Sequence, residues 1–160
     1  MDHVFELQIP ASPEYIAIVR LVVSSLASAR RELADERVDD LKLAVSEACT
    51  NAIEAHQRAG VDASIRVEAY EGDERLEIRI TDRGPGFDPD TLRAHPPVTD
   101  PDRLNFERGL GVPLIRTLVD DASFTPSDEG TTVRMILFGG PSGRGDETSE
   151  ILRTVVAPDE

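Results

Sequence analysis

The chain has 160 residues, of which 39% are hydrophobic, so it suits one compact domain and excludes a multidomain enzyme. Aspartate and glutamate number 31 against 17 lysines and arginines, and the net charge of -14 disfavours direct binding of nucleic acid or anionic lipid. The single cysteine excludes an internal disulfide, and no apolar run reaches the roughly 20 residues of a membrane-spanning helix. With no secretory signal at its start, the sequence predicts a cytoplasmic protein without a membrane partner.

The first part of the chain predicts a strand and two helices. Apolar residues alternate with polar ones over 5–9, as in a strand with one buried face. Ser12, which a proline follows, is the expected N-cap of a helix over 16–29 that is apolar almost all round. This pattern is typical of packing on the core, and it also fits a helix that additionally meets a partner or a second subunit. A second helix is expected from about 36 to 56, and Gly60 ends it.

The remainder predicts more strands on either side of a long loop. The loop, 82–108, is rich in proline, glycine and aspartate and has no regular period, as in a functional lid or a disordered segment. Residues 1–140 are expected to form one domain, and 141–160 a flexible acidic tail. The predicted elements after residue 60 are strands over 64–70 and 76–81, a helix over 110–119, and strands over 122–125 and 131–138.

Two polar residues of the second predicted helix are candidates for catalysis. Glu47 and Asn51 are four positions apart, so their side chains lie one above the other on the flank of the apolar stripe. If they face a cleft, the carboxylate serves as a general base and the amide oxygen as a ligand of Mg²⁺. The alternative is a solvated pair on the helix surface with no chemical role.

Two glycine-containing motifs lie at the two ends of the long loop. The first follows a predicted strand, and its Gly84 and Gly86 allow the backbone to approach a ligand closely, while Asp82 can accept a hydrogen bond from an exocyclic amine. The second, Gly109-Leu110-Gly111, opens a helix whose free N–H groups and dipole favour phosphate oxygens. Taken alone, each motif is more simply explained as a turn that binds nothing.

In their order along the chain, these motifs resemble those of the Bergerat-fold ATPases, and the closest likeness is to the small anti-sigma factor serine kinases of that superfamily. The resemblance covers roughly residues 5–138. It implies an α+β fold, a two-layer α/β sandwich of the Bergerat type with a mostly antiparallel sheet and helices on one face. The long loop then becomes the ATP lid. The chain departs from many relatives at His56, because they place a histidine or lysine nearer to the asparagine.

The resemblance also implies roles for single residues. The segment 46–52 is similar to the N box of the family, which makes Glu47 the base that activates the attacking hydroxyl and Asn51 the Mg²⁺ ligand. Asp82, in a segment similar to the first glycine box, would read the adenine. The residues that would complete the nucleotide site are Gly84, Gly86, Arg108, Gly109, Leu110, Gly111 and Thr131.

The implied function is an ATP- and Mg²⁺-dependent protein serine kinase that is also an anti-sigma factor. It would bind a sigma factor, phosphorylate the anti-sigma factor antagonist on serine, regulate transcription in a stress response, and form a homodimer. One alternative is a catalytically inactive nucleotide-binding module that sequesters a regulatory protein. Another keeps the kinase but places it in a signalling route without a sigma factor.

Overall fold

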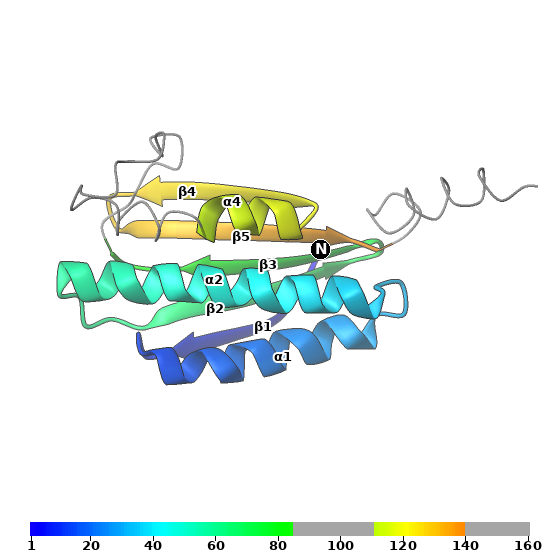
Figure 1. Ribbon diagram of the computed structural model, residues 1–160, viewed down its shortest axis with the longest axis horizontal. Helices are drawn as coiled ribbons and strands as arrows, with labels where there is room; N and C mark the ends of the chain where they lie inside the picture. Colours follow the sequence, from blue (N-terminus) through cyan, green and yellow to red (C-terminus); the bar gives the residue numbers. More distant parts are fainter. Residues whose placement is uncertain (85–110, 140–160) are drawn as a thin grey trace, which may run out of the picture.

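In the part of the chain that the structure describes, a five-stranded sheet carries its helices on one face, which gives two layers (Figure 1). The computed structural model describes residues 1–84 and 111–139. The α+β class, the antiparallel sheet and the one-sided helical layer agree with the sequence prediction. The elements in chain order are β1 (Asp2–Ile9), the 3₁₀ turn η1 (Pro13–Tyr15), α1 (Ile16–Ala29), α2 (Asp35–Ala59), β2 (Ile65–Gly72), β3 (Arg75–Thr81), α4 (Gly111–Leu118), β4 (Asp121–Ser127) and β5 (Gly130–Phe138).

The order of the strands brings distant parts of the chain together. The sheet runs β1-β2-β3-β5-β4, and all neighbouring strands are antiparallel. In the β3–β5 pair, Thr81 lies opposite Thr132. The residues that follow β3 therefore lie beside the first residues of β5, although about fifty positions separate them in the chain.

The hydrophobic core lies between the sheet and the helices. Alternate residues of β2 and β3 point into this core and are fully buried, as the period-two pattern predicts: Ile65, Val67, Ala69, Leu76, Ile78 and Ile80. Helix α2 is longer at both ends than the predicted 36–56, and Gly60 ends it in the left-handed conformation with φ of 64°. Core side chains from the three elements include Leu41, Val45, Ile53, Ile65, Val67, Ile78 and Ile80.

The prediction that Ser12 caps α1 is wrong in its detail. Ser12 precedes the short turn η1 rather than α1, and it makes no side-chain capping bond. Its hydroxyl instead donates to the Glu14 carboxylate at 2.5 Å, because a charged acceptor two residues away competes with the backbone.

Most of the predicted lid and the tail 141–160 lie outside the described residues. Within the described ranges, no helix is both long and apolar enough to span a membrane.

The face of the sheet opposite the helical layer holds a buried glutamate. Glu77 on β3 is fully buried, and its carboxylate accepts hydrogen bonds from Arg75 at 3.2 Å, from Arg79 at 2.9 Å and from Arg134. Burial by itself would raise the pKa of Glu77, but the Arg134 and Arg79 guanidinium groups outweigh it and hold the pKa below its usual value. The carboxylate therefore stabilises the folded state when it is ionised.

Replacing Glu77 by glutamine is expected to lower the free energy of unfolding at pH 7 by about 1–2 kcal/mol. Because the folded-state pKa is depressed, the stabilisation is present above the unfolded-state pKa and is lost as the pH falls through the folded-state pKa. The difference between the natural chain and Glu77→Gln should therefore shrink in acid. Urea unfolding at pH 7 and at pH 3 measures it, and an equal difference at both values would contradict this account.

Candidate functional site

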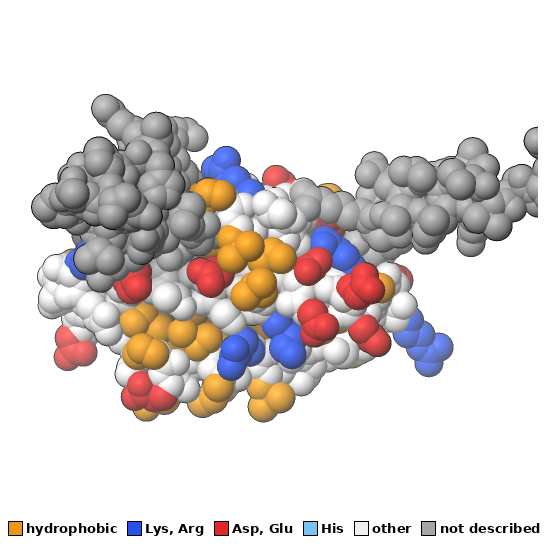
Figure 2. All heavy atoms as spheres, viewed as in Figure 1, with side chains coloured by type: hydrophobic (Ala, Val, Ile, Leu, Met, Phe, Trp, Pro, Cys, Tyr) orange, Lys and Arg blue, Asp and Glu red, His pale blue; other side chains and the backbone are white. Residues whose placement is uncertain are grey.

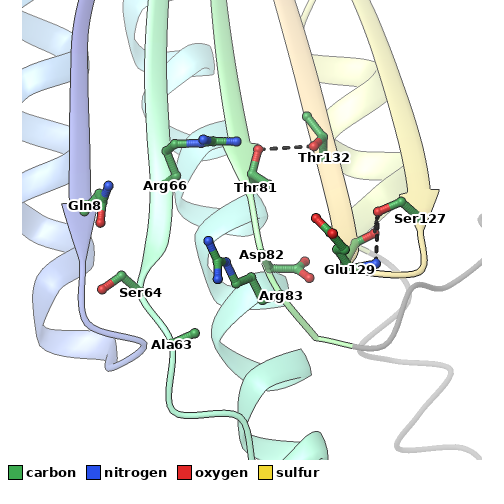
Figure 3. Close-up of a pocket in the computed structure, with 11 residues that line it drawn as sticks. Gln8, Ala63, Ser64, Arg66, Thr81, Asp82, Arg83, Ser127, Glu129 and Thr132 are labelled. Atoms are coloured by element: carbon green, nitrogen blue, oxygen red, sulfur yellow. Dashed lines mark hydrogen bonds between the residues drawn. The ribbon is translucent and has the colours of Figure 1, made fainter.

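Asp82, the residue that follows β3, is held in one position by the start of β5. Its Oδ1 accepts the backbone N–H groups of Gly84 at 2.9 Å and of Thr131 at 3.2 Å. Its own N–H donates to the Thr131 carbonyl at 3.0 Å. Both side-chain bonds use Oδ1, so Oδ2 has no hydrogen-bond partner within residues 1–84 and 111–139. Figure 3 shows this carboxylate directed from the end of β3 toward the β4–β5 turn.

The surroundings of Asp82 are apolar enough to disturb its titration. Its side chain is buried, and burial raises the pKa of Asp82, an effect that the bonds from Gly84 and Thr131 only partly offset. The adjacent Thr131 hydroxyl is also buried and has no hydrogen-bond partner among the residues that the structure describes. An unsatisfied buried hydroxyl beside a carboxylate with a free oxygen is an arrangement that a ligand with both a donor and an acceptor would complete.

Two glycines allow the backbone segments around Asp82 to approach each other. A Cβ atom at Gly84 would lie 2.8 Å from the Ala55 Cβ on α2. A Cβ atom at Gly130 would lie 1.9 Å from the Asp82 carbonyl oxygen, and Gly130 has φ of 148°, which side-chain-bearing residues rarely adopt. Gly130 is thus required at this contact.

Helix α2 carries Glu47 and Asn51 in a row that leads to Ala55, the residue in contact with Gly84. Along the helix axis, Asn51 lies about 6 Å and Glu47 about 12 Å from Ala55. Both polar side chains are half-buried, and neither makes a hydrogen bond or ion pair within the described ranges.

Cys49 between them faces the core, and burial raises the pKa of its thiol to about 12, so it is unreactive at neutral pH.

His56, the position at which the chain departs from many relatives, is a further buried residue of this region. It is 1% exposed, its Nε2 accepts the Arg83 N–H at 2.8 Å, and its Nδ1 lies 3.1 Å from the Ala63 carbonyl oxygen. A signal for it was present, since Ala48, Ala52 and His56 are spaced by four on the buried stripe of α2, where a polar side chain needs partners.

Several predicted site residues cannot be placed. Gly86, Arg108, Gly109 and Leu110 lie outside the described residues. Gly111 is the first residue of α4, a helix that packs against α2 through residues including Ile115. Among residues 1–84 and 111–139, no group of three or more His, Cys, Asp or Glu side chains is arranged to hold a metal ion.

The cavity in Figure 3 lies on the face of the sheet opposite the helical layer. It has a volume of about 590 Å³ and is lined by polar residues, including Arg66, Thr81 and Thr132, whose neighbours along each strand face the core. Asp82 borders this cavity too, from the end of β3. Two residues further along the same segment, Gly84 meets Ala55 on α2.

Comparison with known proteins agrees with this geometry. The family model described as the histidine kinase-like ATPase domain matches residues 9–137. The serine-protein kinase RsbW of Bacillus pumilus (strain SAFR-032) is 39% identical over 139 residues, which are 83% of this chain and 84% of that protein. RsbW of Bacillus subtilis (strain 168) is 37% identical over 137 residues, with the same two coverages.

One solved structure shows the same fold at low sequence identity. It contains the RsbU and RsbW domains of a Mycobacterium tuberculosis protein, and it aligns with a TM-score of 0.60 and 20% identity. The alignment covers 88% of this chain and 34% of that longer chain.

Proposed function

Because this chain belongs to the histidine kinase-like ATPase family, and within it to the RsbW serine-protein kinases, we propose that it is an anti-sigma factor that acts through ATP. The protein is a serine kinase. Its proposed partners are a sigma factor, which it binds and silences in the cytoplasm, and an anti-sigma factor antagonist, which it phosphorylates on serine. The observation that carries the proposal is the Asp82–Thr131 pair, which offers a carboxylate acceptor and a buried hydroxyl donor, the two kinds of group that the edge of an adenine base requires.

The adenine is proposed to lie against Asp82 and Thr131. Its exocyclic amine donates to Oδ2 of Asp82, and a ring nitrogen accepts from the Thr131 hydroxyl, which satisfies the one buried group that lacks a partner there. Backbone N–H groups at the start of α4, with Gly111 as its first residue, suit phosphate oxygens. The other proposed contacts come from Gly84, Gly86, Arg108, Gly109 and Leu110.

Phosphate transfer is proposed to take place beside α2. Glu47 accepts the proton of the substrate serine hydroxyl as its oxygen forms a bond to the terminal phosphorus and the bond to the leaving ADP oxygen breaks. Asn51 suits Mg²⁺, because an amide oxygen free of other partners is a hard neutral ligand that complements phosphate oxygens. When bound, Mg²⁺ neutralises charge that develops on the phosphates. The half-buried positions of both side chains on one row of α2 support these roles.

The outer face of α1 is the proposed protein contact surface. The helix buries the stripe of Val19, Val23 and Ala27 but leaves Ile18 and Leu21 exposed at 46% and 66%. Figure 2 shows hydrophobic side chains in separate groups over the helical layer. A second copy of the chain, as expected for a homodimer, or the sigma factor would cover this apolar surface.

Asp82→Asn tests the nucleotide site directly. The amide would keep the two N–H bonds through its oxygen, but it would present an NH₂ group to the exocyclic amine, so two donors would face each other. At about 100 times its dissociation constant, Mg²⁺-ATP should stabilise the natural protein by roughly 2.7 kcal/mol, and Asp82→Asn should abolish the effect. Thermal unfolding with and without Mg²⁺-ATP measures both values.

The exposed Asp73, in the turn between β2 and β3, provides a control for this experiment, because Asp73→Asn makes the same chemical change at the opposite end of β3. Its nucleotide-dependent shift should equal that of the natural chain. An undiminished shift in Asp82→Asn would remove Asp82 from the adenine contact. If the natural chain shows no shift at saturating nucleotide, the proposal of an ATP-dependent kinase fails as a whole.

A further inference from the structure

His56 connects three segments that lie far apart in the sequence. It is on the last turns of α2, it contacts the loop before β2 through the Ala63 carbonyl, and it contacts the segment after β3 through the Arg83 N–H. Only 1% of its surface is exposed, so water does not reach the ring to replace either hydrogen-bond partner. The mechanism proposed above gives this buried titratable side chain no role.

The two partners of His56 define one form of its ring. A backbone N–H can only donate, so Nε2 must be an unprotonated acceptor toward Arg83. A carbonyl oxygen can only accept, so Nδ1 must carry the proton that it donates to Ala63. The neutral ring with its proton on Nδ1 satisfies both groups, and neither the other tautomer nor the charged ring does.

The bond to Arg83 completes a set of three consecutive backbone restraints. The N–H of Asp82 donates to β5, the N–H of Arg83 to α2 through His56, and the N–H of Gly84 to the Asp82 side chain itself. The chain at Asp82 is thereby fixed against both layers of the fold. Since the Asp82 Oδ1 is occupied, the direction of its free Oδ2 depends on this backbone path.

We propose that His56 is a positioning residue that holds the Asp82 carboxylate where it discriminates adenine from guanine. The inference rests on the proposed function, because it takes Asp82 as the group that meets the base. An adenine donates from its exocyclic amine to Oδ2, whereas guanine carries a carbonyl oxygen there, which a carboxylate repels. Such discrimination requires the carboxylate acceptor to stay at a fixed place. His56 fixes it indirectly, because its bond to the Arg83 N–H holds the backbone next to Asp82.

Two variants separate the bonds of His56. His56→Gln places an amide oxygen near the position of Nε2 and keeps an acceptor for Arg83, whereas His56→Asn reaches only as far as Nδ1 and keeps only the donor to Ala63. We expect the KM for ATP to rise about tenfold in His56→Asn and to stay within about threefold of the natural value in His56→Gln. The preference for ATP over GTP in kcat/KM should fall by a similar factor in His56→Asn only.

The ATP to GTP ratio is the decisive measurement, because a general loss of stability would lower both activities together. Gln57→Ala, at the exposed neighbouring position of α2, is the matched control. Equal KM values and equal ratios in the two His56 variants would overturn the inference. If the natural protein fails to bind ATP, the proposed function fails instead, so the two failures are distinguishable.

A measurement on the natural chain covers the case in which the variants do not fold. Nitrogen-15 NMR of the imidazole should show the proton on Nδ1 and an unprotonated Nε2, and the Arg83 amide should exchange slowly with solvent despite its place outside a strand. The opposite tautomer, or rapid exchange at Arg83, would overturn the positioning role.

Discussion

Glu47→Gln is expected to bind ATP with the affinity of the natural chain and to transfer phosphate to a serine on the antagonist at least about 100-fold more slowly. The amide retains the size of the carboxylate but cannot accept the proton of the serine hydroxyl. Because Glu47 lies about two helical turns from Ala55, where α2 meets the Asp82 segment, the adenine contacts should not change. Transfer of labelled phosphate in single turnover, alongside nucleotide binding by calorimetry, separates the two effects.

Glu54→Gln is the matched control, since Glu54 is a second half-buried glutamate of the same helix. It should transfer phosphate within about threefold of the natural rate, as expected for a side chain outside the transfer step. Transfer by Glu47→Gln at the natural rate would exclude Glu47 as the base. If the natural chain binds ATP but labels no protein, the alternative of an inactive nucleotide-binding module gains support.

Gly130→Ala is expected to lower the free energy of unfolding by about 3 kcal/mol or more and to abolish binding of ATP. The new Cβ would lie 1.9 Å from the Asp82 carbonyl oxygen, and at φ of 148° the residue has no relaxed conformation that avoids it. The start of β5 would have to move away from Asp82, and the Thr131–Asp82 bonds would break with it. Chemical unfolding and ATP titration measure the two losses.

Gly60→Ala separates backbone strain from the clash. Gly60 also has a positive φ, of 64°, but a Cβ there would meet no atom within 4 Å. The expected loss is about 1 kcal/mol, with ATP binding retained. If Gly60→Ala and Gly130→Ala destabilise the protein equally, close packing of β5 against Asp82 is not the reason for glycine at position 130.

Local patterns in the sequence were sufficient for the order and type of the elements. Alternation over 5–9 and 76–81 predicted strands that the structure confirms, because the side-chain period of a strand is two and the apolar residues of each strand pack against the core. Apolar residues at helical spacing predicted helix α2. Gly60 predicted its end, because glycine adopts the left-handed conformation without strain. The motif order gave the family, which the comparisons confirm.

Only the tertiary structure decided which hydrogen bonds and close contacts hold Asp82 in place. The bond from Thr131 joins positions 49 residues apart, and the bond from Arg83 to His56 joins positions 27 apart. The clash that forbids a side chain at Gly130 exists only because β5 lies beside β3. Local periodicity reports the burial of a residue within its own element, whereas contacts between elements depend on strand order and packing, which no short stretch of this sequence encodes.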